Sequence, residues 1–500
     1  MSDQPRPLPD RPNLRYVKLE AKRRLATGEF ATLHDAQLAI AREYGLQSWT
    51  ALKRLIDAQT TSVSGALTQL RWVISRFAGA DSPEWTAPDE EELRGHFNEA
   101  FLTAVGPSTV VSTMSDLAAQ LREELIVAAE TLVSVRARIA DLQIEAAAET
   151  RPPHRLTGLL VYPVPAQVTD PRVKAPSIRT SGHVPPAAVA AAAESFAELG
   201  LVALAMAGAA GDGDAGWAAA HGWASLERAE ALRTDHQFPA YSITKLITST
   251  VVLRLVADGR LRLDDPANRH LRTVRLEDDT VTVRELLTHT GGVHSPGELF
   301  ADRVPDLMSL VGPRLACGGP RGTFAYSNGG YAMLGQLIAD VTESAYDQAA
   351  TRLVLQPLGM NSSSFPITWP STDSVTEYLL TPEGLFEPAP NQMVTLPAAG
   401  GLWTTAPDLV TFGLTWASLL PDDLASEALR PHAERDSSGA QIGLGWLLHQ
   451  AQDVCGHAGG GPNGSSSLLI RLSTGQTSVT LTNRLIPIEP VNLRLIKPIT

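Results

Sequence analysis

The interpretation of this chain rests on one stretch, Phe238-Pro239-Ala240-Tyr241-Ser242-Ile243-Thr244-Lys245-Leu246-Ile247. It begins an apolar periodic segment that predicts a helix over 242–258. Ser242 would lie in the first turn, where unpaired backbone N–H groups and the helix dipole favour developing negative charge. Lys245 is one turn further on, so it shares that face of the helix and can reach the serine hydroxyl. A serine needs such a base to act as a nucleophile, and a desolvated lysine can serve. Alone, the same pattern also fits a helix cap beside a surface lysine.

Two later motifs add groups that such a nucleophile needs. In Tyr326-Ser327-Asn328, followed by two glycines, a loop presents a phenol that can shuttle the serine proton and an amide that can bind a substrate carbonyl. His457-Ala458-Gly459-Gly460 lies close to an apolar strand pattern. Its small residues let substrate approach the backbone, and the Gly460 N–H can join the Ser242 N–H in binding an oxyanion. Each motif alone is also compatible with an ordinary turn.

Taken together, Ser-x-x-Lys, Tyr-x-Asn and His-x-Gly resemble, in order and spacing, the serine hydrolases that include class C β-lactamases, D-alanyl-D-alanine carboxypeptidases and family VIII esterases. The resemblance covers about residues 190 to 485. Flanking runs also match it: Leu261-Arg262-Leu263-Asp264-Asp265-Pro266, Leu286-Leu287-Thr288-His289-Thr290-Gly291-Gly292, Pro357-Leu358-Gly359-Met360 and Gly400-Gly401-Leu402-Trp403-Thr404-Thr405.

The resemblance implies a role for each motif residue. Ser242 would be acylated, Lys245 and Tyr326 would move protons, and Asn328 would orient the substrate. The backbone N–H groups of Ser242 and Gly460 would form the oxyanion hole, and His457 and Gly459 would help to bind substrate. The third motif departs from the Lys-Thr-Gly of many β-lactamases and wall peptidases, in which the lysine helps to hold a substrate carboxylate. A histidine is mostly neutral near pH 7, which weakens the β-lactam interpretation, whereas many esterases and amidases of the group carry a histidine at this position.

The order of predicted elements after residue 185 indicates an α+β domain. A helix over Pro186–Leu199 and strands over Leu201–Ala207 and Trp217–Trp223 open it, and a helical, loop-rich middle follows. Strands over Ile442–Leu448, Ser466–Leu472 and Ser478–Thr482 close the chain. We therefore expect residues 185–500 to form one antiparallel sheet flanked by helices, with a helical subdomain, in the β-lactamase and penicillin-binding-protein manner.

The first 184 residues divide into three parts. Residues 1–60 predict a small helical module that resembles the one often found ahead of ankyrin repeats, although no such repeat follows. Residues 61–166 resemble a cystatin-like or nuclear-transport-factor-like α+β accessory domain. Within it, Ala66–Phe77 and Glu90–Val105 have helical patterns, and Leu125–Ala147 favours strands but leaves helix open. Residues 167–184, rich in proline, are interpreted as a linker.

Composition excludes several classes of function. At 500 residues the chain is too long for one core, and its net charge of -13 disfavours nucleic acid as a partner. Its 2 cysteines have no disulfide or zinc spacing, and no glycine-rich phosphate loop is present, so no cofactor is predicted. The N-terminus lacks an apolar signal region and no stretch is suited to span a bilayer, so we expect a cytoplasmic protein that acts on a small molecule.

Three functions fit these observations. The first is hydrolysis of an ester, less favourably an amide or β-lactam, through an acyl-enzyme on Ser242. The second is acyl transfer or peptidase action on the same scaffold. The third is a binding protein with a retired site, against which the retention of Ser242, Lys245 and Tyr326 together argues. A protein partner of the N-terminal module cannot be named from the sequence.

Overall fold

The structure is a computed structural model of the whole chain. It describes residues 14–27, 30, 32–44, 46, 48–53, 64–82, 84–131, 133–140, 142–163, 168–174, 176–211, 216–297, 299–370, 372–381, 383–435 and 440–496. Among the described helices, none combines the length and the apolar character needed to cross a bilayer.

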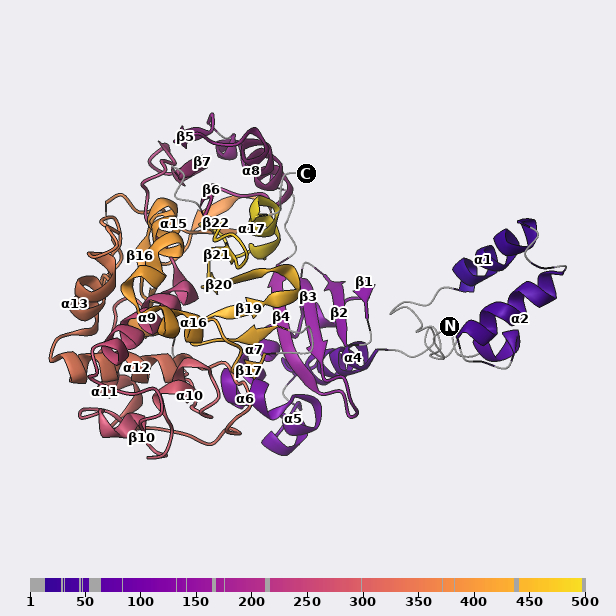
Figure 1. Cartoon of the computed structure of the whole chain (residues 1–500), viewed down its shortest axis with the longest axis horizontal. Coiled ribbons are helices and arrows are strands. Elements are labelled where there is room, and N and C mark those ends of the chain that lie inside the picture. Colours follow the sequence, from indigo (N-terminus) through magenta and orange to yellow (C-terminus); the bar gives the residue numbers. More distant parts are fainter. Residues whose placement is uncertain are drawn as a thin grey trace.

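A ten-stranded antiparallel sheet forms the centre of the described C-terminal part, as predicted (Figure 1). Its order is β17-β18-β19-β20-β21-β22-β6-β7-β5, with β8 paired to β7. The first and last segments of the domain meet where β6 pairs with β22. The strands are β5 Arg179–Ser181, β6 Ala203–Ala209, β7 Trp217–Ser225, β8 Glu230–Ala231, β17 Ala433–Glu434, β18 Gln441–Ile442, β19 Leu447–His449, β20 Val454–Gly460, β21 Ser465–Arg471 and β22 Thr477–Thr482.

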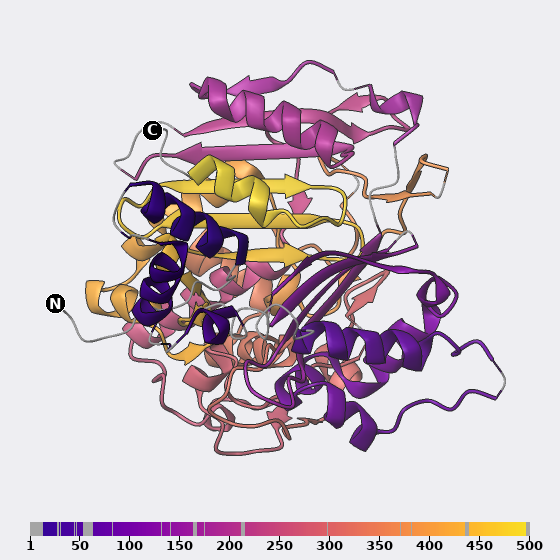
Figure 2. The same cartoon turned by 90° about the vertical axis from the view of Figure 1, so that its right-hand side faces the viewer.

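Helices cover both faces of this sheet because its strands are apolar on both faces. In β6, Leu204 and Met206 join a core with α8 and α17, whereas the alternate alanines face the larger core. Figure 2 shows α8 and α17 lying across the strands. On the other face, α9 and α15 pack with the larger core. These helices are α8 Pro186–Glu198, α9 Thr244–Ala257, α15 Ala406–Thr415 and α17 Glu489–Ile496.

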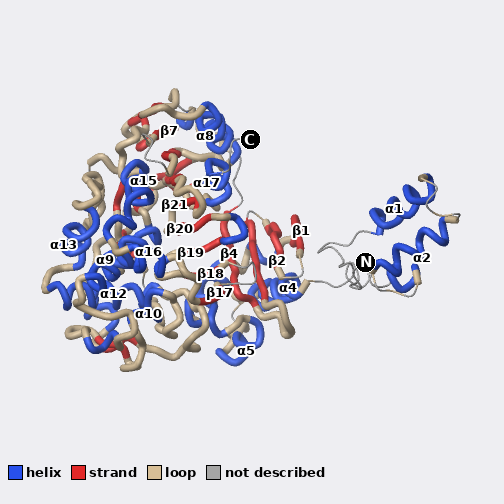
Figure 3. The backbone as a smooth tube through the Cα atoms, viewed as in Figure 1, coloured by secondary structure: helices blue, strands red, loops and turns tan. Residues whose placement is uncertain are grey.

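The chain between α9 and α15 forms the predicted helical, loop-rich subdomain (Figure 3). Its helix α12 packs against α9, α10 and α14, so the subdomain is continuous with the core of the sheet. The helices are α10 Val283–Leu287, α11 Leu307–Val311, α12 Asn328–Thr342, α13 Tyr346–Ala350 and α14 Pro397–Gly400, and α16 Asp422–Ala428 follows α15. Short strands complete this half of the chain: β9 Phe238–Pro239, β10 Arg275–Leu276, β11 Phe300–Ala301, β12 Arg314–Leu315, β13 Tyr378–Leu380, β14 Phe386–Pro388, β15 Met393–Val394 and β16 Trp403–Thr404.

Two predictions about this domain are wrong in detail. Residues 167–184 are not simply a linker, because β5 pairs with β7 in the sheet and the buried Asp170 carboxylate accepts the backbone N–H of Phe386. The strand predicted over Ile442–Leu448 is two strands, because the chain turns at Gly445, whose φ is 88°. Alternation of apolar residues alone did not reveal that turn.

The N-terminal half consists of helices followed by strands in its described residues. Residues 64–163 form four helices followed by an antiparallel meander, β1-β2-β3-β4, around a core of their own. The single helix predicted over Glu90–Val105 is wrong: it is two helices, because Asn98 caps the second through the Phe101 N–H. Ahead of these lie α1 and α2. The bounds are α1 Leu14–Ala26, α2 Leu33–Glu43, α4 Gly65–Phe77, α5 Glu90–His96, α6 Glu99–Val105, α7 Pro107–Asp116, β1 Leu125–Glu130, β2 Ser134–Ile139, β3 Leu142–Ala148 and β4 Leu156–Pro163.

Candidate active site

Ser242 lies at the junction of the sheet and the helical subdomain. It belongs to a short 3₁₀ turn, η3 (Tyr241–Ile243), which leads directly into α9. The Ala240 N–H donates to Leu402 O, and the Ser466 hydroxyl of β21 donates to Ala240 O. Backbone and side-chain bonds from distant segments thus fix the start of the turn. The predicted helix over 242–258 therefore begins two residues later than expected, and Ser242 lies in the turn that precedes α9 rather than in its first turn.

Lys245 is fully buried in the first turn of α9, with its amine directed at three oxygens. Its Nζ lies 3.0 Å from Ser242 Oγ, 2.9 Å from Asn328 Oδ1 and 2.8 Å from Ala399 O. Burial lowers the pKa of this amine well below its usual value. The surface-lysine interpretation of the Ser-x-x-Lys pattern is therefore excluded.

The three oxygens also determine what a neutral Lys245 amine does. Ala399 O and Asn328 Oδ1 can only accept hydrogen bonds, so they take the two N–H groups of a neutral amine. The lone pair is then left for the third neighbour, the Ser242 hydroxyl. The arrangement suits an amine that removes the serine proton.

Tyr326 completes the contacts of the serine oxygen. Its hydroxyl donates to Ser242 Oγ at 2.7 Å. Burial raises the pKa of this phenol to about 12, although the hydrogen bond with Ser242 acts in the opposite direction. The loop that carries Tyr326 is held by the buried His289, whose Nδ1 accepts the Ser327 N–H at 3.0 Å and whose carbonyl accepts the Ala325 N–H. His289 therefore supports the loop, whereas Tyr326 bonds to Ser242 itself.

Asn328 begins α12 and faces the same cleft. Its side-chain oxygen accepts from Lys245, and its backbone N–H donates to Ser295 Oγ at 2.9 Å. The side-chain oxygen of Asn328 is therefore engaged with the lysine. The amide NH₂ is the part of Asn328 that can meet a substrate carbonyl.

His457 is buried on β20, with its ring centre 6.4 Å from that of Tyr326. Its Nδ1 lies 2.5 Å from the carbonyl oxygen of Ala458, so Nδ1 carries the proton. Burial, followed by repulsion from Lys245, lowers the pKa of His457 to about 3. The neutral histidine predicted from the sequence is what the surroundings favour, and its Nε2 has no hydrogen-bond partner among the described residues.

Strand β20 brings Gly459 and Gly460 to Ser242. A Cβ built on Gly459 would lie 2.9 Å from the Ser242 nitrogen and 2.5 Å from Ala240 O, so only glycine allows the strand to pass this close. β19 pairs with β20 only as far as Gly456, so the following residues lack a neighbour on that edge in the described sheet. The geometry suits an oxyanion site formed by two backbone N–H groups.

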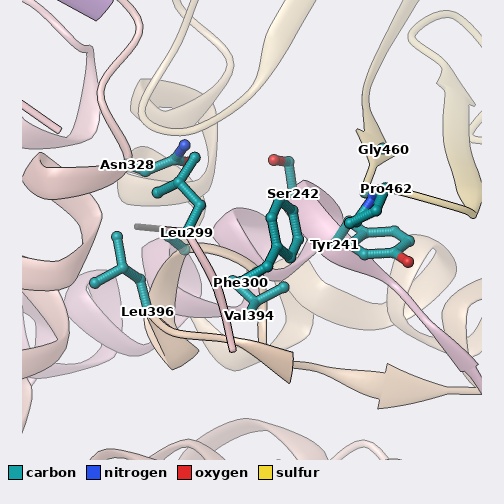
Figure 4. A pocket seen from close by; sticks show the side chains of 12 residues that line it. Tyr241, Ser242, Leu299, Phe300, Asn328, Val394, Leu396, Gly460 and Pro462 are labelled. Carbon is teal, nitrogen blue, oxygen red and sulfur yellow. The ribbon is translucent and has the colours of Figure 1, made fainter. Parts of the chain in front are cut away.

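A cavity of about 290 Å³ opens beside the serine (Figure 4). The Ser242 hydroxyl stands between Asn328 and Gly460, with apolar side chains around it. None of the described residues that line the cavity is charged, and most are apolar: Tyr241, Leu299, Phe300, Val394, Leu396, Ala399, Gly400, Gly461 and Pro462 accompany the three residues just named.

Several of these neighbours were not found from the sequence. Leu299 lies in a loop, and Phe300 lies in β11, which pairs with β15. Nothing in their spacing distinguishes them from ordinary core residues. Ala399 was missed for another reason, since it acts through its backbone carbonyl. Ala399 immediately precedes Gly400 and Gly401, which begin one of the runs that match the family. That position was the one feature of the sequence that could have pointed to Ala399.

The sheet, the helical subdomain and the serine-lysine-tyrosine cluster together have the architecture of the β-lactamase-like serine hydrolases. The family model "Beta-lactamase" matches residues 189–497, and the chain belongs to that family of serine hydrolases, which includes β-lactamases, penicillin-binding proteins, amidases and esterases. The resemblance noted in the sequence and the predicted fold are thereby confirmed.

Individual relatives are distant. The chain is 25% identical over 287 residues to Protein flp of Staphylococcus aureus (strain NCTC 8325 / PS 47), covering 53% of this chain and 56% of flp. It is 27% identical over 287 residues to Penicillin-binding protein 4 of Amycolatopsis lactamdurans, covering 51% and 74%. Among solved structures it is similar to EstCE1, a hydrolase with promiscuous acyltransferase activity, at 19% identity and a TM-score of 0.53, covering 62% and 96%. The chain thus spans about half the length of flp.

Proposed function

We propose that this protein hydrolyses carboxylic esters of uncharged, apolar acids through a covalent acyl-enzyme on Ser242. The observation that carries this proposal is the cavity that adjoins the serine hydroxyl, whose described lining residues are uncharged and largely apolar. A β-lactam or a peptide terminus brings a carboxylate, which needs a cationic partner when it is buried. Burial keeps His457 neutral, and the two cationic side chains whose charge reaches it, Lys245 and Arg435, are not among the residues that line the cavity.

The contacts around the serine support a two-step reaction. Ser242 Oγ attacks the ester carbonyl carbon while its proton passes to the Lys245 amine. The carbonyl oxygen becomes an oxyanion, which the Ser242 and Gly460 N–H groups would stabilise. The C–O bond to the alcohol then breaks, and a proton delivered through Tyr326 neutralises the departing alkoxide. Water attacks the acyl-enzyme by the same route in reverse and releases the acid.

The test compares matched ester, anilide and cephalosporin substrates in the wild type and in Ser242→Ala. We expect ester turnover and covalent labelling by a fluorophosphonate in the wild type, and neither in the variant. Equal ester turnover in the two proteins would refute the proposal. A clear preference for the anilide or the cephalosporin would leave Ser242 as the nucleophile, but it would show that the preferred substrate is an amide or a β-lactam and not an ester.

The same assay separates hydrolysis from acyl transfer. EstCE1 is described as having promiscuous acyltransferase activity, and its fold is similar to this one. Adding an alcohol acceptor and analysing the products shows whether water or the acceptor takes the acyl group. We expect the free acid as the main product. That residues 1–60 are an accessory or docking module, and that the protein is cytoplasmic, are further proposals drawn from the sequence.

A further inference from the structure

A second buried phenol stands on the other side of the nucleophile. Tyr241 directly precedes Ser242, is 4% exposed and lines the cavity with its ring. Its backbone has a φ of 47°, in the left-handed region that residues other than glycine seldom adopt because of steric strain. Such strain persists only where the surrounding structure holds the residue in place.

The Tyr241 side chain is anchored at its far end. Its hydroxyl donates a short hydrogen bond to Oε1 of Glu377, which is 3% exposed and directly precedes β13. In Figure 4 the Tyr241 hydroxyl points away from the Ser242 hydroxyl. A Cβ on Gly461 would lie 2.0 Å from the Tyr241 ring, and one on Gly464 would lie 2.2 Å from Glu377 Oε1. The turn between β20 and β21 therefore encloses the pair.

We propose that Glu377 is a positioning residue for the nucleophile. By accepting the Tyr241 hydrogen bond it fixes the left-handed backbone of Tyr241, and with it the direction of the Ser242 N–H and one wall of the acyl pocket. This inference rests on the function proposed above. It adds a residue that lies 135 positions from Ser242 and belongs to none of the three motifs.

The planarity of the peptide bond explains how the anchor reaches the serine. The carbonyl of Tyr241 and the N–H of Ser242 lie in one rigid plane, so rotation about the Tyr241 backbone turns that N–H as a unit. An oxyanion donor must point at the developing charge to be effective. Fixing both the backbone and the hydroxyl of Tyr241 limits this rotation. Glu377 can therefore affect the reaction without contacting the substrate.

Protonation of Glu377 gives this role a distinct signature. Burial raises the pKa of Glu377 to about 7, against the opposing effect of the Tyr241 hydrogen bond, and burial also raises the pKa of Tyr241 well above its usual value. In the described structure, no charged side chain contributes to the shift of Glu377. Above pH 7 the carboxylate is a strong acceptor for the phenol, and below it the neutral acid is a weaker one. The alignment should weaken as pH falls through 7.

The experiment measures ester kcat, KM and the rate of fluorophosphonate labelling from pH 5 to 9 in the full chain. Glu377→Gln and Tyr241→Phe should each lower kcat by about 5- to 20-fold at pH 8, because a small misplacement of a reacting group is costly. KM should change less than about twofold, since ground-state binding is retained. Both variants should lose the ionisation near pH 7, and the double variant should be no slower than either single variant.

A phenol-carboxylate pair away from the cavity provides a control. The hydroxyl of the buried Tyr378 donates to Oε2 of the exposed Glu227 at 2.5 Å and accepts the Leu226 N–H, and neither Tyr378 nor Glu227 lines the cavity. Tyr378→Phe removes the hydroxyl of a buried tyrosine together with its bond to a carboxylate, and should leave kcat and the pH profile unchanged. An equal effect in Tyr378→Phe would show that any lost phenol bond perturbs the domain, and would overturn the positioning role.

In Glu377→Gln we expect kcat to fall while the melting temperature does not. The native state holds a proton on Glu377 up to about pH 7, whereas the unfolded chain releases it near the ordinary value of 4.5. Because the native state binds more protons in this window, the wild type loses stability there as pH rises. The neutral glutamine has no such loss, so its melting temperature at pH 8 should not fall below that of the wild type. A parallel loss of stability and activity would indicate a structural role only.

The outcomes separate this inference from the proposed function. Labelling of Ser242 in the wild type, with unchanged kcat and pH profile in Glu377→Gln, would overturn the positioning role alone. No labelling of the wild type would overturn the proposed function and the positioning role with it. If Glu377→Gln does not fold, Tyr241→Phe decides, because it keeps the ring and removes only the hydroxyl.

Discussion

The two sides of Ser242 are built on different physical principles. On one side, Lys245, Tyr326 and Asn328 form a cluster in which polar atoms meet at 2.7 to 3.0 Å. On the other, Phe300, Val394 and their neighbours line a cavity whose described residues carry no charge. The first side handles protons, and the second provides space and apolar surface.

This difference teaches which part of the site determines which property. Proton transfer requires particular atoms at hydrogen-bond distance, so few residue types can serve. An apolar wall requires area and shape, so many residues can serve. Changes on the first side should therefore alter kcat with every substrate. Changes on the second should alter the choice among substrates and leave the chemical step intact.

The largest effect is expected from Lys245→Met. Methionine fills the buried space but cannot accept the serine proton, so kcat should fall by at least about 10³-fold for all esters. Fluorophosphonate labelling of Ser242 should slow in parallel. Wild-type labelling should accelerate as pH rises through the pKa of Lys245, which burial lowers below its usual value.

This rising limb should disappear in Lys245→Met. The matched control is Lys174→Met, which changes a lysine that is exposed to solvent. It should leave both the labelling rate and its pH dependence unchanged. Rapid, pH-dependent labelling of Lys245→Met would show that another group removes the proton.

A smaller loss is expected from Tyr326→Phe. Without the hydroxyl that donates to Ser242 Oγ, kcat should fall by about 10²-fold, the lower end of general acid-base contributions. Because burial raises the pKa of this phenol to about 12, the wild type should show no loss of activity from its ionisation below pH 10. A falling limb near pH 9 that Tyr326→Phe abolishes would contradict this. Steady-state kinetics with one ester across pH 6 to 10 provides the measurement.

The same difference explains what could be predicted from the sequence. Ser242, Lys245 and Tyr326 were identified because their chemistry restricts residue type and the spacing along the chain was informative. The sheet was largely predicted because long apolar strands and helices have clear periods. Its turn at Gly445 was not, because a single glycine within an apolar run gives a weak signal.

Contacts that depend on tertiary structure alone remained hidden. Glu377 bonds to Tyr241 across 136 positions of sequence, and an isolated glutamate before a strand has no local signature. The Ala399 carbonyl that accepts from Lys245 is a backbone group, which any residue type would supply. Asn328 was found, but its bond to Lys245 was not predicted, because an amide can serve substrate or protein equally well.

Acyl-chain selectivity tests the apolar side directly. From acetyl to butyryl esters, kcat/KM should rise by about fourfold per added CH₂, the value of burying one methylene. Val394→Thr keeps the shape of this cavity residue but adds a hydroxyl, so the butyryl ester should lose about three- to tenfold and the acetyl ester much less. Val189→Thr, on α8 at the opposite face of the sheet, is the control and should change neither ester. Equal losses with both esters would show that the cavity does not hold the acyl group.

The smallest expected effect comes from giving the site a cation. In His457→Lys, a positive charge replaces a histidine whose pKa burial lowers to about 3. Esters of a dicarboxylic half-acid should then gain about two- to fivefold in kcat/KM relative to neutral esters of equal length, as for a weak ion pair. The control is His457→Gln, which is neutral and should show no such change.

Salt distinguishes a true charge effect in His457→Lys from a change of shape. The gain should shrink as ionic strength rises from about 0.05 M to 0.5 M if the pair forms in the part of the cavity that solvent reaches, because salt screens such a pair over this range. A gain that is insensitive to salt would indicate reshaping of the cleft. No gain would mean that no positive charge at 457 meets a carboxylate, because burial leaves the new amine neutral, as it does for Lys245, or because the amine lies too far from the acyl pocket.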